Sequence, residues 1–201
     1  TLKLTVRKNG VDKEYEFTRK SINLITASGK MLDNNIGYIE ITNFNSTTSL
    51  QFKDALNKLL DDGAKGIVFD VRNNPGGLVD ITLQCLDLVL PYGDYASATY
   101  GNGETKVIDY PRFDSAEDDK KLDIPAVVLV NGKTASAGEL FAASLRDFNG
   151  TKLVGVKTFG KGIMQSTKAL DGGGAITVTV ATYQTTKSDC YHGIGLFPDY
   201  E

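Results

Sequence analysis

The chain has 201 residues, of which 41% are hydrophobic and 23% charged, and its formal net charge is −3. This is the composition of a globular protein with one sizeable core. No Lys/Arg cluster offers the concentrated basic face that nucleic acid requires, and no apolar run reaches the ~18 residues that span a bilayer. A single histidine and two cysteines without a CxxC motif argue against a zinc site and a disulfide framework.

The first elements predicted are a hairpin and then alternating strands and helices. The chain does not begin with Met, and Thr1 leads directly into alternating apolar residues rather than into a signal peptide. The alternation surrounds an Asn9-Gly10 turn signal and predicts a β-hairpin over residues 2–17. The segments predicted next are a strand at 36–41, a helix at 50–60 ended by Gly63, a buried strand at 67–71 and a helix at 78–90. Residues 92–124 show no clear period and are predicted to be irregular.

The strand and helix alternation then repeats. The segments predicted in this half are a buried strand at 126–130, a helix from 137 to about 148, a short strand at 153–156 and a half-exposed strand at 174–183. Strands that alternate with helices form βαβ units, so the sequence predicts an α/β fold.

Two glycine-containing turns follow buried strands, where catalytic groups of α/β sheets gather. In the first, at 70–77, Gly76 and Gly77 allow backbone N–H groups to face a ligand without obstruction by a Cβ atom. Such groups can bind a phosphate or a developing oxyanion. Neither the phosphate-loop nor the dinucleotide-binding motif occurs there. The structural alternative is a tight turn without a ligand.

The second turn, at 131–139, carries Ser136 at the predicted start of a helix. Its hydroxyl is accessible to chemistry, or else it simply caps the helix. A nucleophilic serine needs a base, and the candidates are His192, in a glycine-containing loop, and Lys161, between two glycines after a strand. A lysine screened from water can accept a proton near neutral pH. Gln165, four residues further on, could hold the amine by a hydrogen bond.

The two cysteines invite different interpretations. Cys85 lies in an apolar helical stretch and is predicted to be a small buried hydrophobic residue. Cys190 lies in a polar loop, where the alternatives are a reactive thiol and a residue without a chemical role.

In four stretches, at 66–77, 128–139, 155–165 and 193–199, the sequence resembles the carboxyl-terminal processing (tail-specific) serine protease family. The resemblance implies a serine endopeptidase with a Ser-Lys dyad that needs no metal and no organic cofactor. Glu139 matches a family position near the site, without a defined role. The implied site residues are Ser136 as nucleophile, Lys161 as general base, Gln165 as its orienting partner, and the N–H groups of Gly76 or Gly77 and of Ala137 as the oxyanion hole.

The resemblance also implies the domain organisation and the partners. Residues 27–201 would form an α/β catalytic core, a spiral of βαβ units like those of Clp protease and crotonase. Residues 1–26 would be the C-terminal remnant of a PDZ domain with its linker. The expected substrates are polypeptides with unstructured C-terminal tails, the expected location is the extracytoplasmic side of a bacterial envelope, and a homo-oligomer is a candidate assembly.

Two other functions are compatible with the same residues. One is a non-catalytic peptide-binding module, which covalent labelling of Ser136 would contradict. The other is a crotonase-like acyl-thioester enzyme, which would leave Lys161 and Gln165 without a purpose. A thioester turnover assay distinguishes that alternative from a peptidase.

Overall fold

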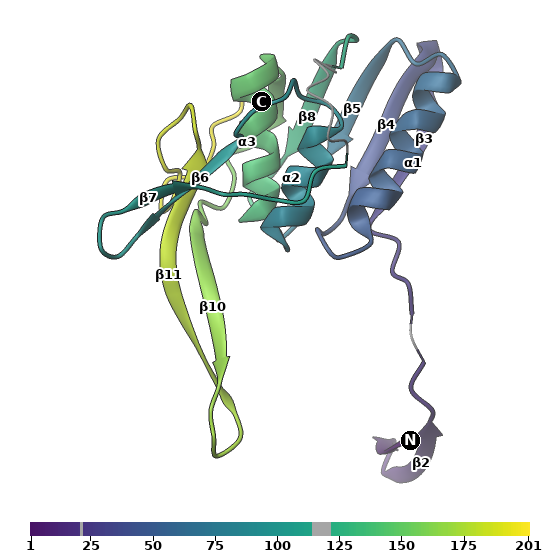
Figure 1. Cartoon of the computed structure of the whole chain (residues 1–201). Helices are drawn as coiled ribbons and strands as arrows, with labels where there is room; N and C mark the ends of the chain where they lie inside the picture. Colours follow the sequence, from purple (N-terminus) through teal and green to yellow (C-terminus); the bar gives the residue numbers. More distant parts are fainter. Residues whose placement is uncertain (21, 114–121) are drawn as a thin grey trace.

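A five-stranded sheet forms the centre of the protein. The computed structural model describes residues 1–20, 22–113 and 122–201 (Figure 1). The strands, in sheet order, are β3 (Ala27–Leu32), β4 (Ile36–Ile41), β5 (Gly66–Asp70), β8 (Ala126–Val130) and β9 (Lys152–Gly155). Only the β3–β4 pair is antiparallel. The carboxyl ends of β5 and β8 therefore meet at one edge, which brings the two glycine-containing turns together.

Three helices cover one face of this sheet (Figure 1). They are α1 (Thr48–Asp61), α2 (Val79–Asp87) and α3 (Ala137–Asn149), and a short 3₁₀ turn, η1 (Asp33–Asn35), joins β3 to β4. Phe52 of α1, Phe69 of β5 and Phe141 of α3 are fully buried, with ring centroids 5.7–6.0 Å apart. Burying each ring contributes about 1.5–3 kcal/mol, so this cluster holds α3 against the sheet.

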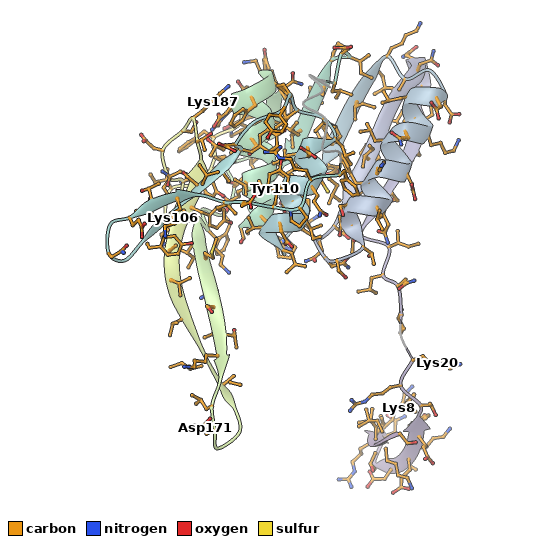
Figure 2. All side chains as sticks on the ribbon, viewed as in Figure 1. Lys8, Lys20, Lys106, Tyr110, Asp171 and Lys187 are labelled. Atoms are coloured by element: carbon orange, nitrogen blue, oxygen red, sulfur yellow. The ribbon has the colours of Figure 1, made fainter. Side chains whose placement is uncertain are left out.

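A second, antiparallel sheet lies beside the first. Its order is β10 (Ile163–Ala169), β11 (Ala175–Thr185), β6 (Ala96–Tyr100) and β7 (Thr105–Val107). Residues 165–179 of the β10–β11 ribbon are exposed, and the ribbon extends away from the body to a tip at Asp171 (Figure 2). Its base, by contrast, is buried against the core at Ala181 and Tyr183.

The first two strands form a separate hairpin. Strands β1 (Leu2–Lys8) and β2 (Val11–Phe17) pair in antiparallel register around Asn9 and Gly10, whose φ angles of 53° and 76° suit a tight hairpin turn. Every residue of the hairpin is exposed, and Figure 1 shows it apart from the sheets. The hairpin is confirmed, and its origin in a PDZ domain stays a prediction, as does a domain boundary at residue 26.

The predicted α/β fold class is confirmed, because the predicted helices and parallel strands are all present. The helix predicted at 78–90 ends at Asp87, since the residue before Pro91 disfavours helical geometry. The irregular structure predicted for 92–124 is wrong at β6 and β7, and residues 114–121 lie outside the described residues. Within the described ranges, no helix is long and apolar enough to cross a membrane.

Candidate active site

Ser136 stands in a strained turn between β8 and α3. Its backbone has φ 56° and ψ −123°, a conformation that residues with a side chain rarely adopt. Ser136 is the N-cap residue of α3, as the capping interpretation requires, but its Oγ lies 3.1 Å from Oη of Tyr183. The hydroxyl is therefore presented to a neighbouring side chain, at a helix N-terminus that favours negative charge.

The turn at Gly76 and Gly77 packs directly against Ser136. A Cβ atom on Gly76, with φ 102°, would lie 2.7 Å from Ser136 Cβ and 2.8 Å from Ala137 N. A Cβ atom on Gly77, with φ 145°, would lie 2.1 Å from the Phe44 carbonyl oxygen. Only glycine permits either approach, so both glycines are required by the close packing of two backbones.

The N–H groups that line this approach are not equivalent. The Gly76 N–H donates to Asn74 Oδ1 at 2.8 Å. Among the described residues, the N–H groups of Gly77 and Ala137 have no acceptor. Ala137 is the first residue of α3, where a backbone N–H lacks an intrahelical partner. Two unpaired donors thus adjoin Ser136, as an oxyanion hole requires.

Asn74 ties the glycine turn to its surroundings. Its side chain is fully buried, and Nδ2 donates to the Ile41 carbonyl at the end of β4 at 2.8 Å. Its carbonyl accepts the Ala135 N–H at 2.9 Å, immediately before Ser136. The sequence does not indicate this role, because Asn is an ordinary residue in turns.

Glu139 joins the turn of Ser136 to the loop of Lys161. Its side chain is completely buried, and its carboxylate accepts four hydrogen bonds of 2.5–3.0 Å. The donors are the backbone N–H groups of Ser136, Gly160 and Lys161 and the hydroxyl of Thr158. The sequence assigned no role to Glu139, and in the structure its carboxylate links the loop of Ser136 to the loop of Lys161.

Lys161 is brought close to Ser136 by its backbone. Its N–H and that of Ser136 donate to the same atom, Glu139 Oε2, at 2.7 and 3.0 Å. The Lys161 side chain is half-buried. Within the part of the chain that is described, its Nζ has no ion pair and no hydrogen bond to Ser136 Oγ. The two residues are joined through Glu139, and no hydrogen bond between the amine and the hydroxyl is present in the described structure.

Gln165 and His192 lie apart from this arrangement. Gln165 is exposed on β10, just after an irregularity in the pairing with β11, and its amide has no hydrogen bond to Lys161. His192 is exposed in the loop that precedes Gly193, and its ring makes no hydrogen bond to Ser136. The predicted hydrogen bond between the Gln165 amide and the Lys161 amine is not present in the described structure, in which Gln165 lies on the extended strand β10.

Tyr183 is a site residue that the sequence did not reveal. It lies near the end of β11, where it is 1% exposed, and its Oη is 3.1 Å from Ser136 Oγ and 3.4 Å from the Lys161 carbonyl oxygen. Burial raises the pKa of Tyr183 to about 12. No signal in the sequence indicates it, because Tyr183 falls on the same phase of the predicted strand as Thr177 and Thr179, opposite the apolar Ile176, Val178 and Val180.

A charged cluster supports the end of β5. Asp70 is buried and accepts hydrogen bonds from Arg72 Nη2 and Tyr38 Oη, each at 2.6 Å. Burial opposes ionisation of Asp70, but these donors and the charge of Arg72 hold the pKa of Asp70 below its ordinary value. The ion pair therefore fixes the residue from which the glycine turn departs.

The cysteines take different positions. Cys85 is fully buried in α2, as predicted, and burial raises the pKa of its thiol. Cys190 is half-buried, with its Sγ 3.4 Å from the Tyr183 carbonyl oxygen. It packs behind the site and not in it.

Known proteins resemble this chain over nearly its whole length. It is 37% identical over 199 residues to a carboxy-terminal processing protease, CtpA, of Bacillus subtilis, covering 98% of this chain and 41% of that protein. It is 36% identical over 193 residues to a carboxyl-terminal-processing protease of Synechocystis, covering 94% and 44%. A solved structure, a photosystem II D1 C-terminal processing protease, superposes with a TM-score of 0.75 at 29% identity, covering 94% of this chain and 51% of that one.

The chain also matches the model of a protein family. The chain spans about two fifths of the length of these curated relatives. Residues 35–201 match the model of the family described as peptidase family S41, and they include every residue of the site above. This protein therefore belongs to peptidase family S41.

Proposed function

We propose that this chain is a serine endopeptidase that hydrolyses peptide bonds through an acyl-enzyme formed on Ser136, with Lys161 as the general base. One observation carries the proposal. Glu139 Oε2 accepts the N–H groups of both Ser136 and Lys161, so the two residues are held side by side next to a glycine turn with an unpaired donor. Membership of a peptidase family supports the same chemistry.

The proposed reaction follows from these positions. Neutral Lys161 takes the proton of the Ser136 hydroxyl while Oγ bonds to the peptide carbonyl carbon. The N–H groups of Gly77 and Ala137 donate hydrogen bonds to the resulting oxyanion. Gly76 contributes only its close packing, because its own N–H already donates to Asn74. Lysinium then protonates the leaving amine, and Lys161 activates the water that hydrolyses the ester.

The Lys161 amine must come within hydrogen-bond distance of the Ser136 hydroxyl for this reaction. Both backbones are fixed on Glu139, so the change is confined to the rotamers of a long, half-buried side chain. We propose that Gln165 orients the amine in that arrangement. The resemblance of the stretch 155–165 to the tail-specific proteases supports this role for Gln165.

The proposed substrates are polypeptides with unstructured C-terminal tails. The support is the naming of two relatives as carboxy-terminal processing proteases. An extracytoplasmic location and a homo-oligomeric state remain proposals that rest on family resemblance.

The test is hydrolysis of an unstructured protein such as casein by the chain and its variants. We expect Ser136→Ala and Lys161→Ala each to abolish cleavage, because groups that act as a unit lose most activity singly. His192→Ala serves as the matched control for a residue outside the site and should retain activity. A fluorophosphonate should add covalently to Ser136 in the parent chain and not in Ser136→Ala.

Three outcomes would contradict the proposal. Loss of activity in His192→Ala together with full activity in Lys161→Ala would make histidine the base. Peptide binding without cleavage or labelling would indicate a binding module. Turnover of an acyl thioester without peptide hydrolysis would indicate the crotonase-like alternative.

A further inference from the structure

We propose that Tyr183 is a further catalytic residue, whose hydroxyl donates a hydrogen bond to Ser136 Oγ, orients it and supports it as it loses its proton. The inference rests on the proposed function. Its starting observation is the 3.1 Å separation of the two hydroxyl oxygens.

The backbone of Ser136 is fixed, so its side-chain torsion is the remaining freedom of the nucleophile. Ser136 N–H donates to Glu139, and Ser136 carbonyl oxygen accepts the N–H groups of Glu139 and Leu140 at 2.9 and 3.0 Å. These bonds fix the backbone, and the Glu139 N–H also faces the Ser136 side chain as part of a capping box. Among the described residues, the side chain that meets Oγ is Tyr183.

Tyr183 is placed rigidly enough to orient a hydroxyl. Its ring is 1% exposed and packs edge-on against Tyr191, with centroids 6.1 Å apart. Its backbone N–H donates to the Gly162 carbonyl at 3.0 Å, one residue after Lys161. The same tyrosine is thus tied to the loop of the base and to the hydroxyl of the nucleophile.

The direction of the hydrogen bond follows from the acidity of the two groups, since a phenol is a stronger acid, and therefore a better hydrogen-bond donor, than an aliphatic hydroxyl group. Burial raises the pKa of Tyr183 to about 12, so the phenol keeps its proton at neutral pH and can donate it. The Lys161 carbonyl, its other acceptor, is more distant at 3.4 Å. When Tyr183 donates, Ser136 accepts on Oγ, and its own proton stays available to the base.

Tyr183 keeps its own proton throughout the proposed catalytic step. The Ser136 O–H bond breaks, its proton passes to neutral Lys161, and Oγ forms the bond to the peptide carbon. Negative charge grows on Oγ before that bond is complete, and a hydrogen bond to a charged atom is about twice as strong as a neutral one. Tyr183 therefore stabilises the transition state more than the resting state.

The experiment compares Tyr183→Phe with Tyr191→Phe. Both substitutions remove one buried phenol oxygen from adjacent rings, but in the described part of the chain only Tyr183 Oη meets Ser136 and Lys161. We expect Tyr183→Phe to lower kcat for casein-derived peptides about 10- to 100-fold with KM little changed. The rate of fluorophosphonate labelling of Ser136 should fall in parallel. Tyr191→Phe should match the parent chain in both assays.

Two further measurements separate chemistry from structure. The melting temperatures of the two variants should agree, and Tyr183→Phe in a Ser136→Ala background should bind the peptide as Ser136→Ala does. Unchanged or increased kcat in Tyr183→Phe would overturn the proposal, as would a rise in KM alone. If the parent chain reacts no faster than Ser136→Ala, the proposed function fails as well. An active parent with unaffected Tyr183→Phe refutes only the role of Tyr183.

Discussion

The backbone N–H groups of Ser136 and Lys161 donate to one oxygen atom, Oε2 of Glu139, at 3.0 and 2.7 Å. The two residues come from different loops, one before α3 and one before β10. A buried carboxylate with four donors is thus the centre of the arrangement. The relative position of the Ser136 and Lys161 backbones therefore depends on Glu139.

Replacing Glu139 should therefore disturb both stability and activity. In Glu139→Gln one oxygen becomes an NH₂ group, which faces backbone donors and leaves them buried without an acceptor. We expect the free energy of unfolding to fall by about 3 kcal/mol and casein cleavage to drop sharply. Urea titration and initial rates measure the two effects. Glu40→Gln, at an exposed position of β4, is the control and should change neither.

The glycine turn gives a second prediction. Gly77→Ala places a Cβ atom 2.1 Å from the Phe44 carbonyl oxygen at a φ of 145°, so the turn must move. We expect the free energy of unfolding to fall by about 2 kcal/mol or more and the labelling of Ser136 to slow. Gly132 lies in the neighbouring turn, and a Cβ atom added there would lie 3.7 Å from its nearest neighbour, Lys157 O. Gly132→Ala should therefore behave as the parent chain does. Equal effects of the two substitutions would refute the packing argument.

The parts of the fold that the sequence predicted are those with a strong local period. Strands β5 and β8 are short apolar runs bounded by turn residues, and α1 and α3 carry apolar residues at helical spacing. Strand β6 reads Ala-Ser-Ala-Thr-Tyr and lacks any such period. Its extended conformation comes from pairing with β11, a contact distant in sequence. Tertiary pairing of this kind overrides local propensity.

The candidate site likewise contains residues whose position local patterns predicted and residues whose position they did not. Ser136 and the two glycines follow predicted strands, so their position at one sheet edge could be inferred from local patterns. Tyr183 reaches Ser136 only because the base of β11 packs against the core. This packing cannot be inferred from a local sequence pattern. The position of Gln165 likewise depends on β10, a strand the sequence did not predict.

The ion pair at the end of β5 predicts a dependence of stability on pH. The pKa of Asp70 is lowered in the folded protein, so its contribution to stability is complete above the unfolded value of about 3.9 and is lost as pH falls through the folded value. Asp70→Asn removes this titration. We expect the parent chain to lose stability more steeply than Asp70→Asn below about pH 4. Urea unfolding from pH 5 to pH 2.5 measures both slopes, and parallel curves would refute the contribution of Asp70.

Recognition of a substrate tail gives the last prediction. Capture of a terminal carboxylate by a PDZ-type groove needs clustered backbone N–H groups and a sheet edge to which the peptide adds. Hairpin β1–β2 is exposed along its length and pairs only within itself, so it forms no such groove in the described structure. We expect this chain to cleave a flexible peptide with the same kcat/KM whether its C-terminus is free or amidated. Deleting residues 1–20 should leave both values unchanged. A marked preference for the free carboxylate that survives this deletion would place tail recognition in the core, beside Ser136 itself.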